Sequence, residues 1–264
     1  MTQTEVMIPA TPAEAVAQFG DGSSITVVAG GTVVLPEITS GRLRPHRVLL
    51  LSRAGLDTIS VEGDSVALGA ALSVNALLAL ADRVPALAEC ALNLADYEIR
   101  AQGTVGGNLC TGHGPDAPRG DLQGPLLALD ATVRSVGAGG ERTEPVEDFL
   151  ASRNGRLVLG VGFDIPAASA FAVLDYPHTH EYTVLAVTGV RAHDGSIRLA
   201  ATGLAGTGAR LRAAEAAAAD VDAAGAAAVS EVTLGDDALA SAWYRAKTLP
   251  VLVRRVLTKL EESA

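Results

Sequence analysis

The residues Val27-Val28-Ala29-Gly30-Gly31-Thr32 end the β-branched run Ser24–Ala29 (SITVVA) in a pair of glycines. Such a run is typical of a buried strand, and the glycine pair at its end predicts a tight turn. A second glycine segment, Gly103-Thr104-Val105-Gly106-Gly107-Asn108, follows about 70 residues after the first. The stretch 103–114 holds five glycines in twelve residues, and we expect it to be irregular.

Outward from these segments, the pattern alternates between strand, loop and helix over the first 165 residues, which is typical of an α/β arrangement. A helix is predicted to begin at Thr11-Pro12-Ala13-Glu14, where a threonine cap precedes a proline, and to stop at Gly20. Further strands are expected at 48–51 and 66–69, further helices at 73–80 and 86–95, and renewed apolar patterning at 126–131 and 132–136.

The residues beyond Pro166–Ser169 have a different character, so we expect a domain boundary there. His193-Asp194-Gly195 lies between two apolar runs and predicts a hairpin. The alanine-rich stretch 210–228 predicts a surface helix, whose later half Gly225 weakens. The stretch 236–260 is amphipathic, and Pro250 is expected to kink or restart that helix. Its apolar face is expected to hold Leu239, Trp243, Leu249, Leu252, Val253, Val256 and Leu260.

The composition describes a chain with enough apolar residues for a buried core. Of its 264 residues 48% are hydrophobic and 19% charged, and the net charge is -10. This acidic balance argues against binding to nucleic acid or to anionic lipid. No apolar run reaches the roughly 18 residues of a membrane span, and no signal peptide is apparent. We expect a soluble, cytoplasmic protein.

The two glycine segments are the best candidates for a binding site. Paired glycines allow backbone amides to turn towards one point and allow an anion to approach the main chain. Thr32, Thr104 and Asn108 add neutral donors, so the segments together are suited to a pyrophosphate. Neither segment matches the Rossmann or P-loop pattern. Taken singly, each glycine pair is more often an ordinary turn.

Other candidate side chains give weaker signals. His178 and His180 have the spacing of one strand face but no third metal ligand, and His113 lies in the second glycine segment. Cys90 is expected to be buried in a helix, and Cys110 is either a buried or a reactive thiol. We therefore assign no catalytic and no metal-binding residue, and we expect a cofactor to supply the chemistry.

Several stretches match one family in its order along the chain. The sequence resembles the FAD-binding medium subunit, or middle domain, of the molybdenum hydroxylases, such as xanthine dehydrogenase and molybdenum-type carbon monoxide dehydrogenase. Its most specific feature is an AGGT…P loop followed later by IR…GTVGGN. The matching stretches are 29–53 (AGGTVVLPEITSGRLRPHRVLLLSR), 98–110 (EIRAQGTVGGNLC), 121–133 (DLQGPLLALDATV), 140–150 (GERTEPVEDFL) and 243–257 (WYRAKTLPVLVRRVL).

The resemblance implies an α+β fold. An FAD-binding domain of the PCMH, or vanillyl-alcohol-oxidase, type would span 1–165 as two α/β subdomains split near 53, and a C-terminal domain of a small sheet with helices would span 166–264. It also implies non-covalent FAD, with Leu94 near the ring system and Asp121 near the nucleotide. The residues expected around the pyrophosphate are Val27, Val28, Ala29, Gly30, Gly31, Thr32, Val33, Val34, Thr104, Val105, Gly106, Gly107 and Asn108.

The chain departs from the family pattern in two places. The stretch Thr111–Gly120 is a few residues longer than the usual linker, which bears on the role of Asp121. The stretch Leu174–His180 lacks the basic pair that many relatives have there.

The function that the resemblance implies is an electron-transfer subunit of a multi-subunit molybdenum hydroxylase. FAD would take electrons from an iron–sulfur subunit and pass them to an external acceptor, and a separate large subunit would hold molybdopterin. Two cysteines are too few for a four-cysteine cluster on this chain. The alternatives are a stand-alone flavin oxidase, for which nine aromatic residues are few, and a non-enzymatic assembly partner that has lost FAD.

Overall fold

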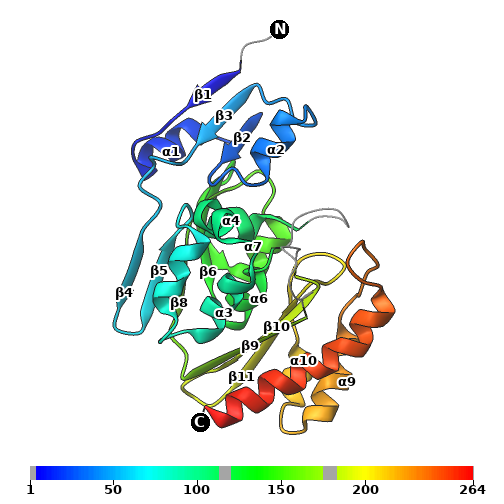
Figure 1. Cartoon of the computed structure of the whole chain (residues 1–264). Coiled ribbons are helices and arrows are strands. Elements are labelled where there is room, and N and C mark those ends of the chain that lie inside the picture. Colours follow the sequence, from blue (N-terminus) through cyan, green and yellow to red (C-terminus); the bar gives the residue numbers. More distant parts are fainter. Residues whose placement is uncertain (1–3, 113–119, 175–182, 264) are drawn as a thin grey trace. The chain divides into compact units, whose positions relative to one another are not determined.

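The computed structural model describes residues 4–112, 120–174 and 183–263. The chain divides into two compact units whose segments alternate along the sequence, and each is described by itself. Unit 1 comprises Met1–Ala76, Tyr97–Cys110 and Thr132–Phe163; unit 2 comprises Leu77–Asp96, Thr111–Ala131 and Asp164–Ala264. Helices and strands are mixed in both units, which confirms the predicted α+β class (Figure 1).

Unit 1 contains a small parallel sheet in the order β1-β3-β2. Its strands are β1 (Glu5–Met7), β2 (Ile25–Val28) and β3 (Arg47–Leu50). Helix α1 (Pro12–Phe19) begins and ends as predicted, because the Thr11 side chain accepts a hydrogen bond from the Glu14 amide and Gly20 follows its last residue. Its buried residues Ala15 and Phe19 join Leu49 of β3 in one apolar cluster.

The second sheet of unit 1 has five strands in the order β4-β5-β8-β6-β7. Its bounds are β4 (Ile59–Glu62), β5 (Ser65–Gly69), β6 (Thr132–Gly137), β7 (Gly140–Pro145) and β8 (Leu157–Asp164). Helix α7 (Val146–Ser152) connects β7 to β8. The two sheets use residues on either side of Arg53, where the subdomain split is predicted, although the domain limits themselves stay predictions.

Three short helices of unit 1 flank the glycine segments: α2 (Val34–Thr39), α4 (Tyr97–Gln102) and α5 (Val105–Cys110). The prediction that residues 103–114 are irregular is wrong for α5. The helix forms because the amides of Val105 and Gly106 bond to the carbonyls of Leu72 and Ala70, at 2.9 and 2.8 Å. These tertiary hydrogen bonds offset the low helix propensity of its glycines.

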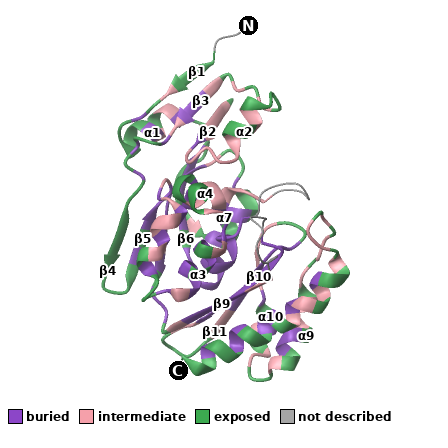
Figure 2. Ribbon diagram, in the orientation of Figure 1, coloured by how far each residue is buried: buried purple, intermediate pink, exposed green. Residues whose placement is uncertain are grey.

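Unit 2 is built on an antiparallel sheet in the order β12-β11-β10-β9. Its strands are β9 (Ala168–Leu174), β10 (Leu185–Arg191), β11 (Ile197–Thr202) and β12 (Ala209–Arg210). The hairpin predicted at His193-Asp194-Gly195 is confirmed by the pairing of β10 with β11. Figure 2 shows β10 buried along most of its length, as expected for a central strand.

Helices α8 (Arg212–Ala216), α9 (Val221–Glu231) and α10 (Ala242–Glu262) complete this half of unit 2. The alanine-rich stretch forms two helices, with Asp220 capping the second, rather than one surface helix. Ala214, Ala224 and Ala228 are fully buried in the core, so the alanines serve close packing. Helix α10 continues through Pro250, so the predicted restart is wrong, whereas the predicted kink stays a prediction.

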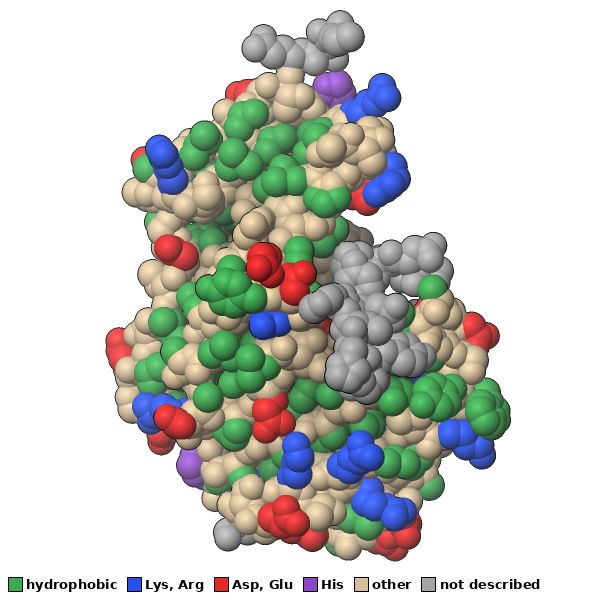
Figure 3. All heavy atoms as spheres, in the orientation of Figure 1, with side chains coloured by type: hydrophobic (Ala, Val, Ile, Leu, Met, Phe, Trp, Pro, Cys, Tyr) green, Lys and Arg blue, Asp and Glu red, His purple; other side chains and the backbone are tan. Residues whose placement is uncertain are grey.

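The apolar face predicted for α10 is correct for Leu249, Leu252, Val253, Val256 and Leu260, all of which are buried. It is wrong for Trp243, which is 68% exposed. Figure 3 shows Lys and Arg side chains gathered over α10; the exposed basic residues of this helix are Lys247, Arg254, Arg255 and Lys259.

The described residues contain three further elements: the 3-10 helix Val74–Leu80, where a helix over 73–80 was predicted, α3 (Pro85–Asn93) and α6 (Gln123–Ala128). In the parts of the chain that the structure describes, no helix is both long and apolar enough to span a bilayer. His113, His178 and His180 lie outside the described residues, so their predictions stay as they are.

Candidate functional site

The first glycine loop connects β2 to α2 in unit 1. Gly31 has a φ of +77°, a left-handed conformation that favours glycine, and its carbonyl accepts a hydrogen bond from the Leu35 amide at 3.0 Å. Val33 is the N-cap residue of α2. Of the candidate residues in this segment Val28 is buried, and the others are half-buried: Val27, Ala29, Gly30, Gly31, Thr32, Val33 and Val34. Most residues of the loop are therefore partly exposed to solvent.

The second glycine loop leads into α5 in the same unit. In addition to the amides of Val105 and Gly106, the Asn108 amide bonds to the Thr104 carbonyl at 2.8 Å and the Gly107 amide to Thr104 Oγ1 at 3.2 Å. Four amides that the sequence offered as anion donors thus bond within the chain. Thr104, Val105 and Gly106 are buried, whereas Gly107 and Asn108 are half-buried. These last two residues form the part of the loop that a ligand can reach.

The structure brings the two loops together. A Cβ atom on Gly30 would lie 1.9 Å from the carbonyl oxygen of Gln102 and 3.2 Å from the Cα of Gly103. A Cβ on Gly103 would in turn lie 3.9 Å from Thr32 Oγ1. Segments about 70 residues apart in the sequence are therefore neighbours in unit 1. Glycine is needed at position 30 because the backbone of the second loop occupies the space of a side chain.

A buried cation, Arg153, lies beside the end of the second loop and was missed by the sequence analysis. It is 5% exposed, and its Nη1 donates to the Leu150 carbonyl at 2.9 Å. Burial lowers the pKa of its guanidinium. Burial raises the pKa of the nearby Cys110 thiol to about 11, and the charge of Arg153 opposes that rise. Arg153 belongs to no recognisable motif, so the sequence held no signal for it.

The other two candidate residues, Leu94 and Asp121, belong to unit 2. Leu94 is buried and caps the end of α3. Asp121 is 5% exposed, stands two residues before α6, and its backbone carbonyl accepts a hydrogen bond from the thiol of Cys90 at 3.5 Å. Cys90 is buried, as predicted, and burial followed by the charge of Asp121 raises the pKa of its thiol. The roles of Leu94 and Asp121 stay predictions.

Among the described residues, no three His, Cys, Asp or Glu side chains gather in a way that could hold a metal ion. The geometry instead offers two adjoining loops with neutral polar side chains, in which backbone atoms lie against Gly30 and Gly103. Gly107 of the second loop differs in its surroundings. Among the described residues outside its own helix backbone and chain neighbours, the one atom within 4 Å of a Cβ position on Gly107 is Thr104 Oγ1, at 2.8 Å.

Comparison with known proteins identifies the class. The profile of the family described as the FAD binding domain in molybdopterin dehydrogenase matches residues 2–163. The chain belongs to this family, which confirms the resemblance seen in the sequence, and FAD is the cofactor of its domain. The neutral, half-exposed glycine loops suit the pyrophosphate of such a dinucleotide.

The individual relatives are named as subunits of dehydrogenases. The chain is 33% identical over 151 residues to the carbon monoxide dehydrogenase medium chain of Hydrogenophaga pseudoflava, a match covering 55% of this chain and 51% of that protein. It is 29% identical to the 6-hydroxypseudooxynicotine dehydrogenase complex subunit alpha of Paenarthrobacter nicotinovorans, covering 90% and 87%. A solved chain of the Hydrogenophaga pseudoflava carbon monoxide dehydrogenase superposes with a TM-score of 0.87 and 28% identity, covering 99% and 98%.

Proposed function

We propose that this chain is the FAD-carrying electron-transfer subunit of a multi-subunit molybdenum hydroxylase. The observation that carries the proposal is the packing of two glycine loops side by side in the part of the chain that matches the FAD-binding family. When bound, FAD supplies a centre that exchanges electrons singly or in pairs. In this proposal the chain binds and orients the flavin, which takes electrons from an iron–sulfur subunit and delivers them to an external acceptor.

The two loops are proposed to hold the pyrophosphate. Thr32 and Asn108 are half-buried and supply neutral hydrogen-bond donors, and Gly107 lets the phosphates approach the main chain. We extend the assignment to the whole of 27–34 and 104–108. Leu94 is proposed to contact the ring system and Asp121 the nucleotide, both on the strength of the family resemblance.

The partners in this proposal are a molybdopterin-binding large subunit and an iron–sulfur small subunit. Relatives named as a medium chain and as a subunit of a dehydrogenase complex support a heteromeric assembly. We place the protein in the cytoplasm, a reducing compartment that suits its free thiols at Cys90 and Cys110. We also propose a domain boundary near residue 165, which separates an FAD-binding domain from a C-terminal domain.

The proposal is tested by purifying the full chain and measuring its visible spectrum before and after acid precipitation. We expect a yellow protein that releases all of its flavin into the supernatant, where chromatography identifies FAD. Colour retained by the precipitate would indicate a covalent link and contradict the non-covalent assignment. Released FMN would contradict the pyrophosphate assignment, and a chain that neither contains nor takes up flavin would contradict the proposed function.

A further inference from the structure

Helix α6 of unit 2 is held at its beginning by Gly208, the residue before β12, and at its end by Arg198 of β11. At its beginning, the fully buried Gln123 accepts a hydrogen bond from the Gly208 amide and donates one to the Thr111 carbonyl, both at 2.8 Å. At its end, Arg198 Nε of β11 donates to the Ala128 carbonyl at 2.9 Å. This last bond places a cation at the C-terminus of the helix, where the carbonyls carry partial negative charge.

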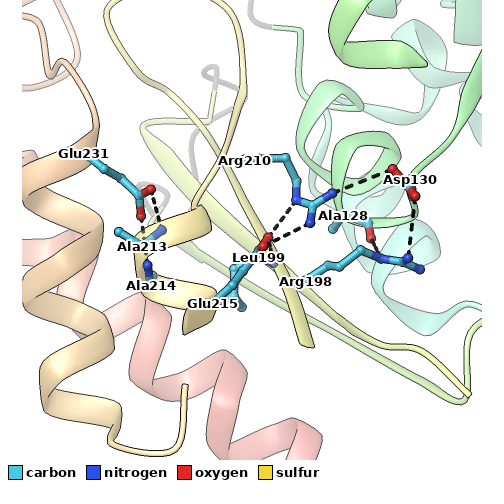
Figure 4. A network of polar contacts seen from close by, with 9 residues as sticks. All are labelled: Ala128, Asp130, Arg198, Leu199, Arg210, Ala213, Ala214, Glu215 and Glu231. Carbon is cyan, nitrogen blue, oxygen red and sulfur yellow. Dashed lines mark hydrogen bonds and ion pairs between the residues drawn. The ribbon is translucent and has the colours of Figure 1, made fainter. Parts of the chain in front are cut away.

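Asp130, just beyond α6, occupies a position at the helix end where glycine is usually found. The amides of Asp130 and Ala131 bond back to the carbonyls of Leu127 and Leu126, at 3.1 and 3.0 Å, in a Schellman arrangement. Asp130 has a φ of +56°, at the position where glycine is most common. Its carboxylate points towards Arg198 and Arg210, at 3.7 and 3.8 Å, as Figure 4 shows. Asp130 therefore adopts a backbone conformation that is unfavourable for a residue with a side chain, and its carboxylate lies near two arginines.

The arginines are themselves fixed by a wider network. Arg210 forms a two-pronged ion pair with Glu215 of α8, at 2.6 and 3.0 Å, and Glu215 also accepts from the Leu199 amide at 2.9 Å. Glu231 of α9 accepts from the amides of Ala213 and Ala214 in α8 (Figure 4). The network therefore connects α6 through β11 and β12 to α8 and α9.

We propose that Arg198 is a positioning residue for Asp121, so that the C-terminal sheet sets how tightly this chain holds FAD. The inference rests on the proposed function, in which Asp121 contacts the flavin nucleotide. Asp121 is buried, and every residue of the helix two positions after it is buried too, so a shift of α6 moves Asp121 with it. Arg198 and Asp130 fix the far end of that helix.

The test is a titration of the flavin-free full chain with FAD, monitored by flavin fluorescence, for the unchanged protein and five variants, one of which is Asp121→Asn. Arg198→Gln removes the charged donor, and Asp130→Asn removes the acceptor charge while keeping a residue that tolerates positive φ. We expect Arg198→Gln to raise the Kd for FAD by about fivefold or more and Arg198→Lys to restore part of the affinity. Asp130→Asn should raise the Kd less, because the Asp130 side chain is 65% exposed. The control Arg134→Gln breaks an exposed ion pair with Glu141 in unit 1 and is expected to leave the Kd unchanged.

A second readout separates positioning from a general loss of stability. For each variant the unfolding temperature is measured with and without FAD. A purely structural role lowers both temperatures equally, whereas a positioning role shrinks the increase that FAD produces. An unchanged Kd and an unchanged FAD-dependent increase in Arg198→Gln would overturn the inference while leaving the proposed function in place. If the Asp121→Asn variant binds FAD normally, the inference also fails, because Asp121 would then make no contact through which Arg198 could act. If the unchanged protein binds no FAD, the proposed function itself is contradicted.

Discussion

At the scale of single residues, the glycines of the two loops are required for different reasons. Gly30 leaves space for this chain's own backbone at Gln102, whereas Gly107 faces little besides the Thr104 hydroxyl. Gly31 has a third requirement, because its positive φ disfavours any side chain. The sequence predicted that the glycines of both loops let a phosphate approach the main chain. Their contacts in the structure indicate that a substitution at Gly107 tests this role most directly.

We predict that Gly107→Ala weakens FAD binding by about tenfold or more, because a methyl group would stand between the main chain and the phosphates. The flavin-free chain should lose about 1–2 kcal/mol of stability, because the methyl group would lie 2.8 Å from Thr104 Oγ1 and displace the hydroxyl that accepts from the Gly107 amide. FAD titration and urea denaturation measure the two effects. The control is Gly206→Ala, whose added methyl group has open space.

The contrasting variant is Gly30→Ala. Its methyl group would overlap the Gln102 carbonyl, so we expect the flavin-free chain itself to lose roughly 1–3 kcal/mol of stability. If Gly107→Ala retained full flavin affinity, the second loop would be a structural turn and the pyrophosphate would be bound elsewhere.

A pH-dependent prediction concerns Cys110, measured in a Cys90→Ala variant so that one thiol remains. Burial raises the pKa of Cys110 from 9.0 to about 11. At pH 8 we therefore expect alkylation by iodoacetamide about 100-fold slower than for a free thiol, rising steadily towards pH 11. Because the folded pKa is the higher one, the associated stability is present below pH 9 and is lost as the pH rises through about 11. The chain unfolded in urea is the control, and rapid alkylation of the folded variant at pH 8 would contradict the assignment.

At the scale of elements, short sequence motifs predicted the helix and the hairpin whose ends are fixed by residues next to them in the sequence. The Thr11 cap with Pro12 fixes the start of α1, and the Asp194-Gly195 pair fixes the β10–β11 hairpin. Helix α5 could not be predicted in this way, because its amides are satisfied by carbonyls of Ala70 and Leu72, far away in the sequence.

The same reasoning explains the misjudged C-terminal helices. Gly225 was expected to weaken a surface helix, yet a Cβ there would lie 2.9 Å from the Cβ of Pro250. The missing side chain of α9 thus accommodates the proline of α10, and a contact between two helices decides both positions. The helix propensity of a single residue gives no information about such a contact between two helices.

The beginning of α10 depends on the buried side chain of Arg245. Its two Nη atoms bond to Asp237 at 2.8 Å and to the carbonyls of Gly235 and Ala240, and its Nε bonds to the Val184 carbonyl at 3.2 Å. We predict that Arg245→Gln lowers the free energy of unfolding by about 3–5 kcal/mol, because it leaves Asp237 buried without its counter-charge.

Urea denaturation measures this loss, and α10 offers its own control. Arg254 forms an ion pair with Asp222 in which both side chains are largely exposed, so Arg254→Gln should cost no more than about 1 kcal/mol. Equal losses in the two variants would show that burial adds nothing to the Arg245 pair.

At the scale of the whole molecule, the sequence predicted the fold class and the pairing of the glycine loops, and the family match confirms the cofactor. It did not predict Arg153, whose place beside Cys110 arises only when α7 and α5 come together in unit 1. Nor did it predict the support of α6 by Arg198, since an arginine in a strand carries no signal for the helix carbonyl it will meet.

The last prediction concerns the chain as one part of a larger enzyme. Loaded with FAD and purified alone, it should be reduced by artificial reductants but not by purines, aldehydes or heteroaromatic compounds, because in the proposed function the substrate site lies on another subunit. We expect its contact with those subunits to depend largely on shape and apolar surface. Adding the cognate molybdenum and iron–sulfur subunits should make bleaching of the flavin absorbance depend on substrate. The control is the same mixture without the iron–sulfur subunit, which should stay yellow. Bleaching by substrate in the single purified chain would instead establish a stand-alone flavin oxidase.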